Sequence, residues 1–61
     1  MNVIEYCYNH NSDTYVFVVK EKETNTPIIK KYDKDYYKTL NDLRTIWNCH
    51  LVKRVDDDTL N

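Results

Sequence analysis

The chain contains no glycine, and this absence restricts how its backbone can turn. Turns that need a positive φ angle normally use glycine, so here they must fall on asparagine or aspartate, the next most tolerant residues. The polar segment 9–13 is the first place where we expect such a turn, with Asn9, Asn11 or Asp13 in the left-handed conformation. Alanine is also absent. Because both residues have GC-rich codons, the composition indicates an AT-rich genome, such as that of a low-GC bacterium, a phage or a mobile element.

The chain length of 61 residues predicts a single domain, residues 1–61, with one small hydrophobic core. A chain of this size buries only about 60% of its unfolded surface and is marginally stable. Two cysteines permit at most one disulfide, so the protein is not a disulfide scaffold. The longest apolar run, residues 15–19, is too short to cross a bilayer. We therefore expect a soluble, cytoplasmic protein with reduced thiols and no cofactor, placed in the host cytoplasm if a phage encodes it.

Three segments in the first half of the chain have the composition of β-strands. Residues 3–8 and 14–20 are rich in β-branched and aromatic side chains and are separated by the polar turn 9–13. The strand over 14–20 has apolar side chains on both faces, which indicates a central strand or an edge that pairs with a second chain. Residues 28–32 predict a shorter third strand after Pro27, and its lysines are typical of an exposed edge.

The second half of the chain predicts a helix followed by a strand. Asp33 or Asp35 is expected to cap the start of the helix. An apolar stripe of helical period follows, made of Tyr36, Leu40, Leu43 and Trp47. Asn48 can end the helix in the left-handed conformation. Residues 49–55 then predict a final strand, and residues 56–61 form an acidic tail that we expect to fray.

The element order β-β-β-α-β predicts an α+β fold. In this fold a small antiparallel sheet of three to four strands carries one α-helix packed on one face. The helical stripe and one face of the central strand would then form a single core. Its centre is expected to contain Phe17, Leu40, Leu43 and Trp47.

Four soft ligands raise the question of a metal site. Cys7 and His10 have Cys-x-x-His spacing, Cys49 and His50 are adjacent, and zinc prefers four nitrogen or sulfur ligands. Neighbouring residues of a strand point to opposite faces, so the adjacent pair could share one ion only at a bend. The favoured interpretation is therefore packed cysteine and surface histidine without metal. A zinc site and a Cys7–Cys49 disulfide are the alternatives.

Signatures of catalysis are missing from the sequence. A chain without glycine cannot contain a P-loop or a dinucleotide fingerprint. Ser12 is the only serine, and it lies in a polar turn. Cys7 and His10 could act as nucleophile and base only with a third, orienting group that the sequence does not reveal. We therefore expect a protein that is not an enzyme.

Six tyrosines in so short a chain favour protein binding, because tyrosine is enriched at interfaces. One helix and a small sheet cannot cover all of them, so the face opposite the helix is expected to stay partly apolar. The predicted binding residues are Tyr6, Tyr8, Val16 and Val18. They would form a homodimer face or the binding face for another protein. For an accessory gene of a phage or mobile element, the expected partner is a host protein, for example of a defence system, that is inhibited or modulated.

Nucleic-acid binding is the alternative function. Basic and aromatic side chains alternate between residues 30 and 38, and such a pattern can hold a single strand by stacking and phosphate contacts. The candidate residues are Lys30, Lys31, Tyr32, Lys34, Tyr37 and Lys38. Against this interpretation, the net charge is −1, the isoelectric point is about 6.0, and Asp33 and Asp35 interrupt the pattern. Another protein therefore ranks above nucleic acid as the expected partner.

Overall fold

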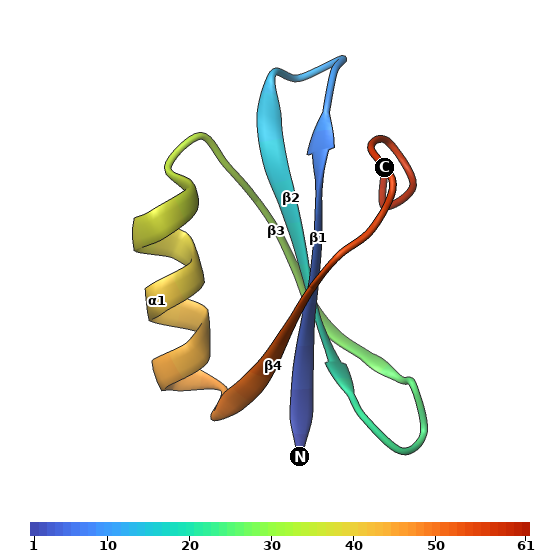
Figure 1. The fold of residues 1–61 in the computed structure, drawn as a ribbon, viewed down its shortest axis with the longest axis vertical. Coiled ribbons are helices and arrows are strands. Elements are labelled where there is room, and N and C mark those ends of the chain that lie inside the picture. The colour runs from blue at the N-terminus through green and yellow to red at the C-terminus, as the bar shows by residue number, and fades with distance from the viewer.

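The computed structural model describes all residues from Met1 to Asn61. A four-stranded sheet carries a single helix on one face (Figure 1). In chain order the elements are β1 (Asn2–Asn9), β2 (Thr14–Glu21), β3 (Pro27–Asp33), α1 (Tyr36–Ile46) and β4 (Cys49–Arg54). The predicted α+β fold and the order β-β-β-α-β are confirmed.

The sheet is mixed, with the strand order β3-β2-β1-β4. β1 pairs with β2, and β2 with β3, in the antiparallel sense that the sequence predicts. β4 instead lies parallel to β1, which corrects the prediction of an antiparallel sheet. The reason is that α1 returns the chain along the sheet to the end at which β1 begins (Figure 1). β4 must then run in the same direction as β1, as in other helical crossovers.

Asparagine and aspartate occupy every left-handed position of the backbone. These residues are Asp13, Asn25, Asn48 and Asp58, with φ angles of 55°, 59°, 52° and 64°. Asn48 ends the helix as predicted, and in the first hairpin the left-handed residue is Asp13. Asn9 stabilises the same hairpin differently, because its side-chain Oδ1 accepts hydrogen bonds from the backbone N–H groups of Asn11 and Ser12 at 3.0 and 3.2 Å.

Two aspartates fix the start of α1. Asp35 is the N-cap, and its Oδ1 accepts a hydrogen bond from the Lys38 backbone N–H at 3.0 Å. Asp33 in turn accepts from the Asp35 N–H at 2.9 Å, and this bond is the main cause that lowers the pKa of the Asp33 carboxyl. The cap is therefore Asp35, with Asp33 holding it in place.

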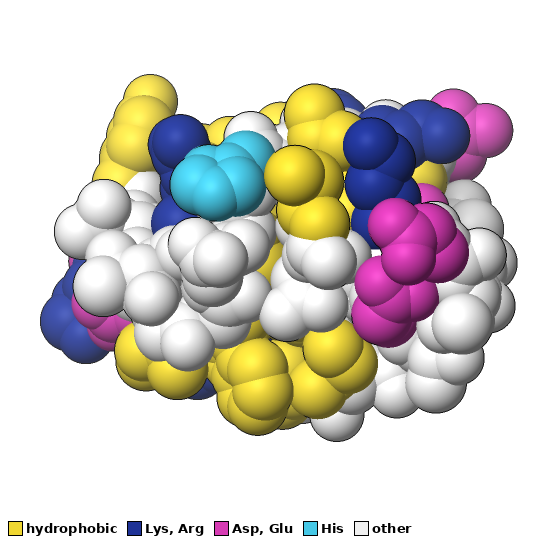
Figure 2. Space-filling view, turned by 90° about the horizontal axis from the view of Figure 1, so that it is seen from below, with side chains coloured by type: hydrophobic (Ala, Val, Ile, Leu, Met, Phe, Trp, Pro, Cys, Tyr) yellow, Lys and Arg dark blue, Asp and Glu magenta, His cyan; other side chains and the backbone are white.

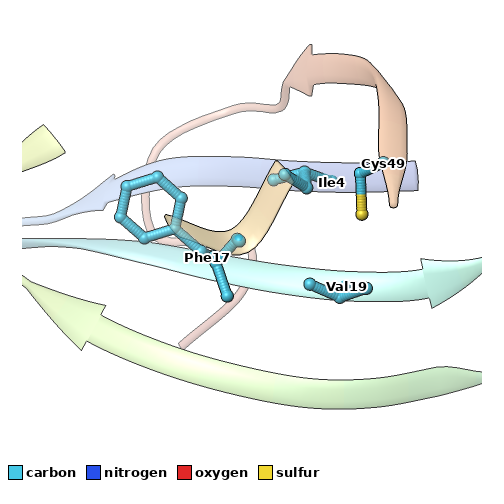
Figure 3. Packing of buried hydrophobic residues seen from close by; sticks show 5 residues of the cluster. Ile4, Phe17, Val19 and Cys49 are labelled. Carbon is cyan, nitrogen blue, oxygen red and sulfur yellow. The ribbon is translucent and has the colours of Figure 1, made fainter. Parts of the chain in front are cut away.

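The core lies between α1 and the face of the sheet that it covers. Figure 3 shows the core side chains of β1, β2 and β4 close together on this face. The buried members are Ile4, Phe17, Val19, Leu43 and Cys49. The prediction is confirmed for Phe17 and Leu43, whereas Leu40 and Trp47 are only partly buried at the margin. Trp47 is marginal because it is the C-cap residue, beyond the last full turn of α1.

Removing the N-cap should destabilise the fold. We expect Asp35→Ala to lower the free energy of unfolding by about 1 kcal/mol, because the Lys38 N–H loses its acceptor. In a domain of this size, such a loss corresponds to a fall in melting temperature of about 4–8 °C. Thermal melting followed by circular dichroism measures this change.

Asp42→Ala is the matched control, since Asp42 is an aspartate of the same helix that only forms an i,i+4 ion pair with Lys38. Such an exposed pair contributes about 0.3–0.5 kcal/mol. An equal loss of stability in the two variants would contradict the capping role of Asp35.

Candidate protein-binding surface

Five of the six tyrosines gather on the helix-covered side of the sheet, at the end where α1 begins. We call them the tyrosine surface: Tyr6, Tyr8, Tyr15, Tyr36 and Tyr37. Strand register brings three of them together, because β1 pairs antiparallel with β2 and Tyr8 lies directly opposite Tyr15. Tyr6 lies opposite Phe17 on the same face, so the surface continues into the core.

The rings of the tyrosine surface support one another. The Tyr36 ring centroid lies 5.1 Å from that of Tyr6 and 5.3 Å from that of Tyr15, with interplanar angles of 59° and 56°. Tyr37 meets Tyr36 edge-on, at 5.1 Å and 82°. Tilted and edge-to-face pairs are favourable arrangements for aromatic rings. The rings therefore form a ridged surface in which each orientation is supported by a neighbour.

One ring of this surface is free for an incoming molecule. Tyr37 is 81% exposed, whereas Tyr6, Tyr15 and Tyr36 are partly buried. A shallow pocket of about 280 Å³ lies among these four rings and the Arg54 side chain. The pocket thus combines aromatic walls with phenolic hydroxyls and one guanidinium.

Tyr36 keeps its proton throughout the physiological range. The neighbouring Tyr6 hydroxyl and burial together raise the pKa of Tyr36 to about 12, with the interaction with Tyr6 as the larger cause.

Arg54 closes the tyrosine surface on the side of β4. Its guanidinium carbon lies 5.7 Å from the Tyr6 ring centroid, within the range of a cation–π contact. Its Nη2 donates to Asp57 Oδ1 at 2.9 Å, and this bond raises the pKa of Arg54. The same bond lowers the pKa of Asp57, and His10, whose Nε2 lies 3.3 Å from Asp57 Oδ2, lowers it further.

The acidic tail 56–61, for which the sequence predicts fraying, is attached to β1. The Asp58 N–H donates to the Tyr8 carbonyl at 2.9 Å, and the Asp58 carboxylate accepts from the His10 N–H at 2.9 Å. The Asp57 carboxylate accepts from the Tyr8 N–H at 3.2 Å. In Figure 1 the C-terminal turn lies beside the upper end of β1. The tail therefore continues the pairing of β1 beyond the end of β4.

The opposite end of the molecule has no comparable gathering of tyrosines. Figure 2 views this end, and hydrophobic side chains show there in several patches between charged and polar ones. Ile46, the last residue of α1, is one exposed hydrophobic residue outside the tyrosine surface. The sixth tyrosine, Tyr32, lies in β3 and is 46% exposed.

The structure separates the residues predicted for protein binding, which are Tyr6, Tyr8, Val16 and Val18. Both tyrosines belong to the tyrosine surface on the helix-covered side. The two valines lie on the other side of β2, where Val16 is fully buried and Val18 nearly so. On that face Glu5 and Lys20 form an ion pair of 2.9 Å next to Val18. The four residues therefore do not form one surface, because side chains alternate between the faces along each strand.

The residues of the nucleic-acid alternative are also divided: Lys30, Lys31 and Tyr32 lie in β3, Lys34 lies between β3 and α1, and Tyr37 and Lys38 lie in α1. Lys30 lies over the Tyr32 ring at 5.4 Å on one face of β3. Lys31 points to the other face, since it lies opposite Phe17. Lys38 pairs with Asp42 at 3.2 Å. The segment therefore does not form one continuous basic surface.

The cysteines and histidines do not form one site. Cys7 and Cys49 are free and buried, and burial raises the pKa of the Cys49 thiol. β1 and β4 are neighbours, but Cys49 lies opposite Asn2 rather than Cys7. His10 contacts Asp57, His50 is exposed, and no three His, Cys, Asp or Glu side chains are arranged to hold a metal. The structure therefore assembles neither the zinc alternative nor the disulfide.

No protein-family model, curated protein or solved structure gives a significant match to this chain. The helix α1 is not long and apolar enough to cross a membrane. A function is therefore proposed from the protein's own geometry.

The sequence analysis does not include Tyr15, Tyr36, Arg54 or Asp57 among the binding residues, and it names Tyr37 only for the nucleic-acid alternative. The apolar stripe predicts Tyr36 in the core, and this residue is partly buried at the core margin. The spacing of Arg54 and Asp57 could have indicated the ion pair between them, since a basic and an acidic residue three positions apart can pair locally. Their position beside Tyr6 depends on the parallel pairing of β4 with β1 and could not be read from spacing.

The attachment of the tail should depend on the charge of Asp57. The pKa of the Asp57 carboxyl is lowered in the folded protein. The ionised carboxylate therefore stabilises the fold fully above its ordinary pKa near 3.8, and this stabilisation is lost as the pH falls through the lowered pKa. We therefore expect Asp57→Asn to speed hydrogen exchange of the Asp58 amide at neutral pH. The difference from wild type should vanish in strong acid. Hydrogen exchange followed by NMR measures both effects.

Asp56→Asn is the control for this experiment, because it removes a neighbouring charge of the same tail. Asp56 bonds to the Thr59 N–H through its backbone carbonyl, which the substitution leaves in place. If Asp56→Asn matched Asp57→Asn at neutral pH, general tail charge rather than the Arg54–Asp57–His10 contacts would hold the tail.

Proposed function

We propose that the protein is a non-enzymatic binding module that holds another protein on its tyrosine surface. The observation that carries the proposal is the exposed Tyr37 ring at the edge of a pocket lined by Tyr6, Tyr15, Tyr36 and Arg54. Tyrosine and arginine, together with tryptophan, are enriched among the residues that contribute most of the binding energy at protein interfaces. This pocket consists entirely of these two residue types.

The fixed arrangement of the rings supports the same proposal. A tyrosine has few rotatable bonds, and here each ring already contacts a neighbour, so little conformational entropy remains to be lost on binding. The phenolic hydroxyls add donors and acceptors at the margin of an apolar surface. Such a combination suits a protein partner, which offers both apolar side chains and backbone polar groups.

Within this proposal the partner is a host protein, and binding inhibits or modulates it in the host cytoplasm. The support for this part is compositional, because a chain without glycine and alanine, whose codons are GC-rich, indicates an AT-rich genome such as that of a phage or mobile element. Pairing of two copies through the same surface is the simplest competing form of protein binding. Measurement of the molar mass in solution over a range of concentrations separates the two forms.

Replacing the exposed ring should remove binding without disturbing the fold. We expect Tyr37→Ser to weaken capture of the partner at least tenfold, a loss of about 1.4 kcal/mol, since a hot-spot ring is lost. The circular-dichroism spectrum should stay unchanged, because Tyr37 is mostly exposed. Affinity capture from a low-GC bacterial lysate identifies the partner by mass spectrometry, and titration with the purified partner gives the affinity.

Tyr32→Ser is the matched control, as it removes another exposed tyrosine, from β3. Equal binding by wild type and the Tyr37 variant would refute the proposed surface. Capture that disappears with nuclease and with high salt would instead favour the nucleic-acid alternative, because phosphate contacts weaken steeply with salt.

A further inference from the structure

The tyrosine surface continues along the outer side of α1. A second shallow pocket, of about 490 Å³, is lined by Tyr37, Lys38, Leu40, Asn41 and Arg44. It shares Tyr37 with the pocket among the tyrosines, so the two hollows adjoin at this ring. A partner that covers Tyr37 can therefore reach both.

The charged residues that line these two pockets are all cations. They are Lys38, Arg44 and Arg54. No carboxylate lines either pocket, but Lys38 pairs with Asp42 at 3.2 Å and Arg54 with Asp57 at 2.9 Å. Arg44 forms no ion pair within the protein. This surface therefore offers one unpaired cation, Arg44, beside two that a partner must share with the protein's own carboxylates. A partner that brings carboxylates can pair with Arg44 and compete for the other two cations.

Arg54 already binds a carboxylate, that of the protein's own tail. Its Nη2 lies 2.9 Å from Asp57 Oδ1, in a pair whose side chains are 52% and 36% exposed. An ion pair this exposed contributes little free energy, because water solvates both charges well. A carboxylate from a partner can therefore compete with Asp57 for the guanidinium, while the Tyr8 N–H and His10 still hold Asp57.

We propose that the partner presents an acidic segment with an aromatic side chain, whose carboxylate replaces Asp57 on Arg54 while its ring packs on Tyr37. This inference rests on the proposed function and specifies the chemistry of the partner. The aromatic side chain fits the pocket because its walls are tyrosine rings that favour tilted or edge-on contacts. Further carboxylates of the segment then lie along α1, near Arg44.

An acidic protein segment suits this surface better than a nucleic acid. A nucleic acid carries a continuous row of phosphates, and it would meet the carboxylates of Asp33 and Asp35 before α1 as well as those of the acidic tail. A protein segment needs only a few carboxylates at the positions of the cations.

Selection from a library of short random peptides displayed on phage tests the inference without knowledge of the natural partner. Wild type, Tyr37→Ser, Arg54→Gln, Arg44→Gln and the control Tyr32→Ser are used as parallel baits. We expect wild type and Tyr32→Ser to enrich peptides with aspartate or glutamate beside an aromatic residue. The other three variants should lose this enrichment.

Selected peptides are then synthesised and titrated by fluorescence anisotropy. Replacing their Asp and Glu by Asn and Gln should weaken binding, and so should an increase in salt. Binding to the Asp57→Asn protein should be about threefold tighter, the scale of one exposed ion pair, since the internal competitor has lost its charge. Equal or weaker binding to this variant would contradict the exchange of carboxylates on Arg54.

The outcomes separate this inference from the proposed function. Neutral or basic peptides that still require Tyr37 would overturn the acidic segment and leave the tyrosine surface as a protein-binding site. If no peptide depends on Tyr37, the inference fails. The proposed function is then tested separately, by comparing the affinities of wild type and Tyr37→Ser for the captured partner. Binding of a short oligothymidylate in place of peptides would overturn the inference in favour of nucleic acid.

Discussion

Phe17 links the core of this protein to its tyrosine surface. Its ring is fully buried beneath α1, and it lies 6.0 Å from the ring of Tyr6 and 6.1 Å from that of Tyr36. The same side chain therefore fills the core and supports the rings above it. A domain of this size has no room for separate layers of core and supporting residues, because most of its chain stays near the surface. The stability of the fold and the proposed binding consequently depend on one set of aromatic contacts.

The parts of the fold that the sequence could predict depend on interactions between residues that are close together in the chain. Alternation of apolar residues defined the first strands, the stripe from Tyr36 to Leu43 defined the helix, and a carboxylate at Asp35 defined where it starts. Asn48 ended the helix because no glycine was available. These features depend on neighbours within a few residues, and the sequence contains them directly.

Long-range pairing accounts for what the sequence could not predict. The direction of β4 follows from the path of α1 across the sheet, and the irregularity in pairing between Asn2 and Val3 sets which residues of β4 meet β1. Only this register brings Arg54 opposite Tyr6. For a related reason the residues Tyr6, Tyr8, Val16 and Val18 do not share one surface, since they come from the two faces of the sheet.

The attachment of the tail to β1 has a consequence for the order in which the chain folds. β1 is paired along both edges, with β2 on one side and with β4 and the tail on the other. Its second set of partners lies about 50 residues later in the chain, for example Asp57 with Tyr8. Contacts between such distant residues form late, because closing a long loop costs entropy before the contacts compensate for it. During synthesis, the first three strands are therefore complete while one edge of β1 is still open, and this edge closes only when the residues after α1 have been made.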